Sequence, residues 1–207
     1  RNKLNPVAPN EGQKWKTFLD NHREIMASMD FKVTFDWRAR QLFILNIIDH
    51  SRRKLLISRA TYNPSSEWVS RQIREAFPFN DVPRFMLLDH DSIFMPVPRR
   101  TLPNMGIRAV HTTVGCPWLN GIVERFNRTL IEELLNHVIP ISPEHLNRLL
   151  KEYRVFYNTA RPHQANEGES PIPIDQVAND VLYANGRLKV EATPWLGGLH
   201  RSYRKVA

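Results

Sequence analysis

The sequence has 207 residues, of which 42% are hydrophobic and 24% charged, proportions that are ordinary for a folded domain. Lys and Arg total 29 against 21 Asp and Glu, and the resulting net charge of +8 favours an anionic partner such as nucleic acid. The single cysteine, Cys116, excludes an internal disulfide scaffold and a cysteine-ligated structural zinc site. No apolar run approaches the roughly 20 residues of a membrane-spanning helix, so no membrane partner is expected.

The first half of the chain predicts a short arm followed by strands. Residues 1–22 are polar, with apolar residues recurring only from Trp15, and we expect an arm or linker there with one short helix. Because the sequence begins with Arg1 rather than Met, we expect a fragment or a processed product. Alternating or continuous apolar residues then predict three strands, at residues 25–35, 42–48 and 55–61. Their short connections imply antiparallel neighbours.

A helix and two further strands are expected next. Asn63 and Pro64 supply a cap and a first-turn proline for a helix in which Val69, Ile73 and Phe77 recur every fourth residue. Short strands are predicted at residues 84–88 and 107–112, with a proline-rich, basic stretch between them and a loop after them.

The second half of the chain is predicted to be helical. Apolar residues at Val123, Phe126, Leu130 and Leu134 form one face of a helix that begins near Gly121. Ser142 and Pro143 open a second helix that ends before Pro162. Strands followed by helices predict an α/β domain with a mixed sheet flanked by helices.

Three acidic residues lie at unusual positions. Asp30 lies inside the first strand, where Asp is disfavoured, and Asp89 follows a buried strand at its carboxyl end, where α/β sheets bind ligands. Glu124 lies in the first turn of a helix. Taken singly, each acid has a structural explanation. Asp30 fits an edge residue or the partner of an arginine, Asp89 fits a turn or cap residue, and Glu124 fits a charge that complements the helix dipole. Together, two strands and a neighbouring helix can bring three hard oxygen ligands to one point, which suits Mg²⁺ or Mn²⁺.

Two motifs resemble a known family. Residues 115–130, Gly-Cys-Pro-Trp-Leu-Asn-Gly-Ile-Val-Glu-Arg-Phe-Asn-Arg-Thr-Leu, resemble the Asn-Gly-x-x-Glu-Arg-x-Asn-x-x-Leu signature of DDE transposases, the insertion-sequence enzymes related to retroviral integrases. Residues 157–164, Tyr-Asn-Thr-Ala-Arg-Pro-His-Gln, look like the Tyr-Asn-x-x-Arg-Pro-His motif of the same family. Asp89 stands where the family commonly has Asp-Asn-Gly-Ser, and 34 residues separate it from Glu124, close to the usual spacing. The likeness runs from about residue 22 to residue 173.

The resemblance implies a ribonuclease-H-like fold with a five-stranded mixed sheet. It implies a catalytic core at residues 23–165, preceded by the arm at 1–22 and followed by a C-terminal extension at 166–207 that is basic at its end. Asp30, Asp89 and Glu124 would be the catalytic residues and would hold two Mg²⁺ or Mn²⁺ ions. The expected activity is cleavage at transposon ends followed by transfer of the freed 3′-hydroxyl into target DNA.

The resemblance also implies partners and a location. The partners would be element ends and target DNA, and the active complex would be a homo-oligomer. The location would be the bacterial cytoplasm, in association with the nucleoid when DNA is bound. Basic residues are expected to contact DNA phosphates, namely Arg99, Arg100, Arg128, Arg161, Arg201, Arg204 and Lys205. Arg161 has the alternative role of fixing the end of the last helix, and Arg99 and Arg100 that of a solvated loop. Arg125 is a further candidate for phosphate contact, but a structural ion pair is the favoured expectation for it.

The sequence departs from the family pattern at two places. Asp91 replaces a usual glycine and is an alternative metal ligand, although Asp89 has the better spacing. Arg128 falls one turn after Glu124, where integrases present a basic residue, but Ile131 stands at the next such position. Two other functions stay open: a ribonuclease-H-fold nuclease that only hydrolyses DNA, and a catalytically silent, domesticated DNA-binding domain.

Overall fold

The computed structural model describes residues 15–78, 82–88, 97–111, 120–173 and 189–206. Its strands are β1 (Met26–Phe35), β2 (Gln41–Asp49), β3 (Leu55–Thr61), β4 (Phe85–Leu88), β5 (Arg108–His111), β6 (Lys189–Trp195) and β7 (His200–Val206). Its α-helices are α1 (Trp15–His22), α2 (Ser66–Ala76), α3 (Leu102–Asn104), α4 (Gly121–Glu133) and α5 (Pro143–Thr159). Short 3₁₀ turns span Arg23–Ile25, Leu135–His137, Gln164–Asn166 and Leu196–Gly198, and a π-helical turn spans Val97–Thr101.

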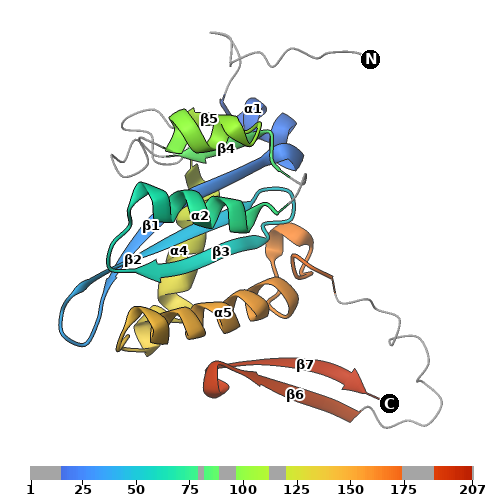
Figure 1. Ribbon diagram of the computed structural model, residues 1–207. Helices are drawn as coiled ribbons and strands as arrows, with labels where there is room; N and C mark the ends of the chain where they lie inside the picture. The colour runs from blue at the N-terminus through green and yellow to red at the C-terminus, as the bar shows by residue number, and fades with distance from the viewer. Residues whose placement is uncertain (1–14, 79–81, 89–96, 112–119, 174–188, 207) are drawn as a thin grey trace.

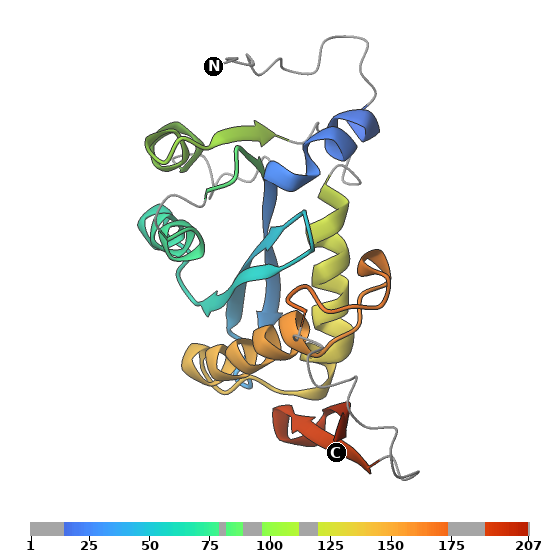
Figure 2. The same cartoon turned by 90° about the vertical axis from the view of Figure 1, so that its right-hand side faces the viewer.

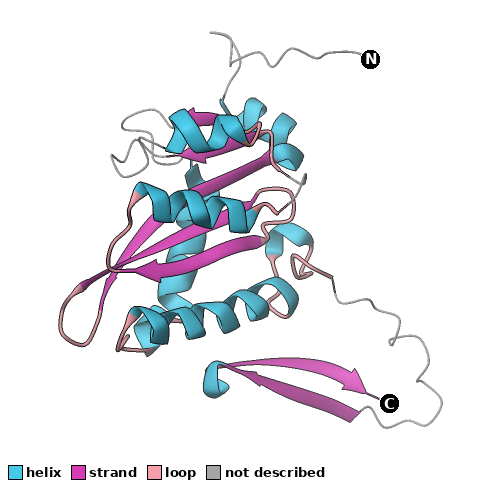
Figure 3. Ribbon diagram, viewed as in Figure 1, coloured by secondary structure: helices cyan, strands magenta, loops and turns pink. Residues whose placement is uncertain are grey.

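Five strands form one mixed sheet in the order β3-β2-β1-β4-β5 (Figure 1 and Figure 3). The first three strands are antiparallel neighbours, whereas β4 runs parallel to β1 and β5 runs parallel to β4. In register, Asp30 lies opposite Asn46 of β2, and Ser28 lies opposite Leu87 of β4. The predicted five-stranded mixed sheet is therefore confirmed.

Helices cover both faces of the sheet, and each face has its own apolar core. Met29 and Ile47 belong to a core beneath α2 and α3, which includes Val69 and Ile73 of α2. The alternate positions of β2, such as Ile44, turn to the other face and pack beneath α4 and α5. Figure 2 shows α2 and α3 on one side of the sheet and α4 on the other. Burial on both faces explains the nearly continuous apolar run of β2.

Helices α2 and α5 begin at serine caps. Ser142 accepts a hydrogen bond from the backbone N–H of His145, and Pro143 occupies the first turn of α5, as predicted. The cap of α2 was predicted two residues too early. Ser65, rather than Asn63, accepts from the backbone N–H of Trp68 at 3.2 Å. Phe77 ends the helix as its buried C-terminal cap residue.

The end of the chain forms a two-stranded antiparallel hairpin, β6–β7, which sequence patterns did not predict. It packs on α5: the His200 ring stacks on Phe156 with centroids 4.7 Å apart, and the Trp195 ring lies 5.9 Å from the same phenylalanine. The His200 Nε2 atom lies 2.7 Å from the carbonyl oxygen of Glu133, which joins the hairpin to the end of α4. The extension is thus attached to the core through α4 and α5 (Figure 1).

Candidate active site

Asp30 lies in the middle of β1 with its carboxylate held by two hydrogen bonds. Its Oδ1 accepts from the backbone N–H of Phe31 at 2.8 Å, and its Oδ2 accepts from Nδ2 of Asn127 at 2.8 Å. Because Asn127 belongs to α4, this second bond joins the strand directly to the helix. Asp30 is half-buried, so both its rotamer and its direction are set by groups that the fold itself positions.

Helix α4 carries Glu124 to the same region. Val123, Phe126 and Leu130 bury one side of the helix against the sheet, which fixes its rotation. Glu124 lies in the first turn, is exposed, and precedes Asn127 by three residues, so the two side chains project from one side of the helix. A carboxylate at this end of a helix is stabilised by the helix dipole. The helix therefore presents Glu124 one turn before the residue that binds Asp30.

A chain of side-chain hydrogen bonds crosses the sheet beneath α4 and ends at Asp30. The Ser58 hydroxyl of β3 donates to Oδ1 of Asn46 at 2.7 Å, and Nδ2 of Asn46 donates to Oδ1 of Asn127 at 2.7 Å. The Asn127 amide then donates to Asp30. Asn46 is fully buried, so satisfying both ends of its amide matters for stability. Every amide donates toward Asp30, which suits a final acceptor that is a carboxylate.

Sequence reasoning missed the roles of Asn46 and Asn127. Both carried the signal that identified Asp30, namely a polar residue where the pattern requires an apolar one. Asn46 interrupts the apolar run of β2, and Asn127 falls on the inward side of α4 between Val123 and Leu130. The contact between Asn46 and Asn127 could be identified only from the packing of α4 on the sheet.

The second predicted aspartate, Asp89, and its alternative, Asp91, lie outside the described residues. Strand β4, which precedes them in the sequence, is described as far as Leu88. Among the described residues, no group of three or more His, Cys, Asp or Glu side chains has a metal-binding arrangement. Asp30 and Glu124 are carboxylates, and hard oxygen ligands of this kind fit Mg²⁺ or Mn²⁺.

The residues predicted to bind DNA have different surroundings. Arg100, Arg128 and Arg201 are exposed, whereas the side chains of Arg99, Arg204 and Lys205 lie outside the described part of the chain. Arg161 is engaged: its Nε and Nη2 donate to Oε1 of Glu133 at 2.9 Å and 2.7 Å. Tyr153 donates to the other oxygen of the same carboxylate at 2.8 Å. These bonds favour the alternative role of Arg161, that of fixing the end of α5.

Arg125 differs from its expected role, because its side chain forms no ion pair with any residue that the structure describes. It is exposed on α4 and lines a cavity of about 330 Å³ together with Arg53 and Arg161. Arg53 was not among the residues predicted to bind DNA.

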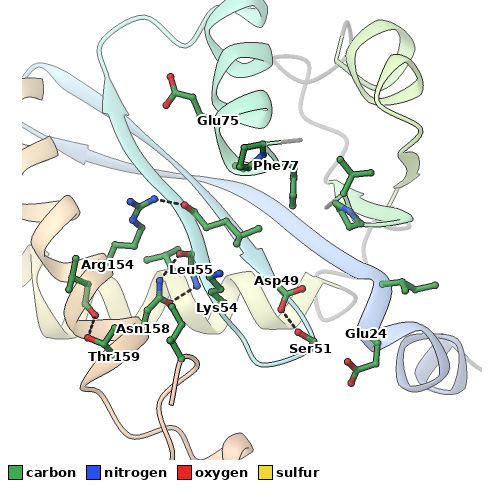
Figure 4. Close-up of a pocket in the computed structure, with 18 residues that line it drawn as sticks. Glu24, Asp49, Ser51, Lys54, Leu55, Glu75, Phe77, Arg154, Asn158 and Thr159 are labelled. Carbon is green, nitrogen blue, oxygen red and sulfur yellow. Dashed lines mark hydrogen bonds between the residues drawn. The ribbon is translucent and has the colours of Figure 1, made fainter. Parts of the chain in front are cut away.

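A larger cavity, of about 780 Å³, lies beside the turn between β2 and β3. Figure 4 shows it between the end of α2, the start of β3 and the end of α5, with Glu24, Asp49, Lys54 and Arg154 among its labelled residues. In it, Arg154 donates to the carbonyl oxygen of Leu56 at 2.6 Å. Neither Asp30 nor Glu124 lines this cavity, so we do not place the candidate active site in it despite its larger volume.

Comparisons with known proteins identify related sequences and similar folds. Residues 105–171 match the family described as integrase core domain. A protein of Xanthomonas euvesicatoria, described as an uncharacterized 39.2 kDa protein of insertion element IS476, is 24% identical over 155 residues, which is 74% of this chain. The chain is therefore similar to integrase core domains over residues 105–171, and to an insertion-element protein over most of its length. The matched region is 45% of the IS476 protein, so the chain spans less than half of that relative.

Solved structures show the same fold. The catalytic core domain of BIV integrase aligns with a TM-score of 0.53 at 16% identity, covering 72% of this chain and 91% of that one. The HTLV-2 integrase catalytic core, solved in complex with magnesium, gives 0.54 at 15% identity and covers 72% and 93%. A chain of the simian T-cell lymphotropic virus intasome, solved in complex with the PP2A regulatory subunit B56 gamma, gives a TM-score of 0.57 at 13% identity and covers 87% of this chain and 66% of that one. The core is therefore ribonuclease-H-like, as expected.

In the part of the chain that the structure describes, no helix has the length and apolar character to cross a membrane.

Proposed function

We propose that this chain is the catalytic core of a transposase that cleaves DNA at transposon ends and joins the freed 3′-hydroxyl to target DNA. The observation that carries the proposal is the hydrogen bond from Asn127 to Asp30 at 2.8 Å. It joins the helix bearing Glu124 to the strand bearing Asp30, in a chain whose sequence matches the integrase core family.

Asp30, Asp89 and Glu124 would hold two Mg²⁺ or Mn²⁺ ions, and the fully oxygen donor set suits these cations. When bound, such ions supply Lewis acidity that lowers the pKa of an attacking hydroxyl and stabilises a leaving oxygen. The protein contributes the direction of the Asp30 carboxylate, which Phe31 and Asn127 fix, and the position of Glu124. The HTLV-2 relative in complex with magnesium supports a divalent cation here.

DNA binding would use exposed arginine side chains. Arg128 lies one turn after Glu124 on an exposed surface of α4, and Arg100 and Arg201 are exposed elsewhere. Such contacts neutralise phosphates without reading sequence. The intasome and the dimeric and trimeric forms described for the viral relatives support a homo-oligomeric active complex for this chain. The IS476 relative supports action on bacterial DNA, in the cytoplasm and at the nucleoid.

The test compares Glu124→Gln with Glu132→Gln, an exposed glutamate two turns later on the same helix. We expect Glu124→Gln to abolish Mg²⁺-dependent nicking of a transposon-end duplex while salt-sensitive DNA binding is retained. Glu132→Gln should nick like the parent chain. Equal nicking by both variants would remove Glu124 from the site.

A pre-cut DNA end separates the proposed function from hydrolysis alone. Joined products from a supplied 3′-hydroxyl end would support a transposase, whereas nicking without joining would indicate a hydrolytic nuclease. Binding with neither reaction, in any divalent cation, would indicate a silent DNA-binding domain.

A further inference from the structure

A basic cavity of about 330 Å³ lies between α4, the turn that follows β2 and the end of α5. Three arginines line it, Arg53, Arg125 and Arg161, and no carboxylate is among its described lining residues. Glu133 neutralises Arg161 through bonds of 2.7 Å to 3.0 Å. Two positive charges therefore remain at the cavity.

Arg53 and Arg125 lack partners among the described residues. Neither forms an ion pair there, and Nε of Arg53 is buried without a hydrogen bond. Burial lowers the pKa of Arg53, and the nearby charges of Arg23 and Arg125 lower it further. Guanidinium groups that repel one another in a partly buried site gain from an anion that neutralises both.

The fold holds Arg53 in this position. Its backbone has φ of 60°, in the left-handed region that residues other than glycine seldom adopt. The preceding residue, Arg52, fixes the turn: its guanidinium donates to the carbonyl oxygen of Pro171 at 2.9 Å, and its own carbonyl accepts from Asn166 at 2.9 Å. An uncommon backbone conformation held from outside is typical of a functional position.

The cavity is close to the candidate active site because both use the same turns of α4. Arg125 directly follows Glu124, and Thr129, one turn later, also lines the cavity. An α-helix with its side chains is about 10–12 Å across, so the cavity and the Glu124 side of α4 are about one helix width apart. A nucleic-acid strand lying across the exposed surface of α4 reaches both, with Arg128 on the same exposed surface.

We propose that Arg53 and Arg125 form a binding pocket for a phosphate of the DNA backbone, one helix width from Glu124. The proposal rests on the proposed function, because it assigns the anion to the strand that is cleaved or joined. Guanidinium groups match phosphate in geometry and form paired, charge-assisted hydrogen bonds with it. Burial raises the pKa of Tyr157, another lining residue, to about 12, so its hydroxyl stays neutral and does not repel an anion.

The first experiment measures DNA binding over a range of salt concentrations. The variant carries Arg53→Gln and Arg125→Gln, and the matched control carries Arg71→Gln and Arg74→Gln, two exposed arginines of α2 on the other face of the sheet. We expect the pocket variant to bind roughly tenfold more weakly and its slope of log K against log salt to fall by about one. An unchanged slope, or an equal change in the control, would overturn the proposal.

The second experiment uses inorganic phosphate as the probe. At constant ionic strength, phosphate should raise the thermal unfolding midpoint of the parent chain and not that of the pocket variant. The pocket variant should itself be as stable as the parent, since it loses a repulsion rather than an ion pair. Stabilisation by phosphate with an unchanged DNA salt slope would indicate a site for a free anion and overturn the DNA assignment. A parent chain that binds DNA through the pocket but never nicks it would refute the proposed function alone.

Discussion

Asp30 and Asp36 lie on the same hairpin, six residues apart, and their surroundings differ in kind. Asp36 accepts from the backbone N–H groups of Arg38 and Arg40, both at 2.9 Å, and from the Tyr62 hydroxyl at 2.7 Å. Most of these donors belong to its own turn. Asp30 accepts from its neighbour in the strand and from a helix that lies 97 residues away in sequence.

Asp36 is a carboxylate that stabilises its own turn, whereas Asp30 is oriented by a second element, the helix α4. The side chain of Asp36 is fully covered, and its partner Arg40 completes an ion pair at 2.8 Å. Asp30 stays half-buried, and its partner Asn127 is on the helix that carries Glu124. The surroundings of Asp36 indicate a structural role, and those of Asp30 support the catalytic role that we propose for it.

The largest effect is expected from Asp30→Asn. The amide keeps the size of the side chain but removes the charge that a cation requires, so Mg²⁺-dependent nicking should fall by about a thousandfold or more. Thermal unfolding, followed by circular dichroism, should give nearly the parent midpoint. Asp36→Asn should show the reverse pattern, with a lower midpoint and with nicking retained below it. If both variants lost nicking and had similar thermal unfolding midpoints, the two aspartates would not have different roles.

A smaller effect is expected from Asn127→Ala, which leaves Asp30 in place but removes its donor from α4. Residues that orient metal ligands typically contribute 10- to 100-fold in metal affinity or activity. Nicking should therefore need a correspondingly higher Mg²⁺ concentration, measured as the half-saturating concentration of the ion.

Asn147→Ala is the matched control, because Asn147 also ties a helix to a strand, bonding the N–H and C=O groups of Ala60 at 2.7 Å and 3.0 Å. It should lower stability without changing the Mg²⁺ requirement. If both variants changed that requirement equally, Asn127 would be a general packing residue rather than one that positions Asp30.

The smallest effect concerns acid stability. Burial alone would raise the pKa of Asp36, but hydrogen bonds from Tyr62, Arg40 and Arg38 outweigh it and lower the pKa from 3.8 to about 2. A lower pKa in the folded state means that the charged group stabilises the fold above about pH 4, and that this contribution is lost as the pH falls toward 2.

Tyr62→Phe removes one of these donors, so the folded-state pKa of Asp36 should rise toward 3.8 and stability should change less across this pH range. Urea unfolding between pH 4 and pH 2 measures the difference. A Tyr62→Phe variant with the same pH dependence as the parent would show that the turn, rather than the tyrosine, sets the pKa.

Much of the core could be predicted because each strand and helix carries its own pattern. Alternation along β1 and the four-residue spacing of α2 depend only on which side of an element is buried. The β6–β7 hairpin could not be predicted in this way. Pro194 lies inside β6, which argues against a strand, and the hairpin packs on the core through His200 and Trp195.

The candidate site could be predicted only in part, for a related reason. Asp30 and Glu124 fall within motifs or at unusual positions, so single residues identified them. Asn46 and Asn127 act as a pair across two elements, and their contact depends on how α4 packs on β2. Arg53 depends on a left-handed backbone conformation that nothing in its residue type favours.

The hydrogen-bond chain from Ser58 to Asp30 has a mechanical consequence for the whole helix. The rest of the interface between α4 and the sheet is made of apolar residues such as Val123 and Leu130, which tolerate sliding. A slip of one helical turn, about 5.4 Å, would keep much of that apolar contact but would leave the amides of Asn46 and Asn127 unpaired inside the protein. The buried pair of Asn46 and Asn127 therefore fixes the register of α4 on the sheet, as buried asparagines fix the register of coiled coils.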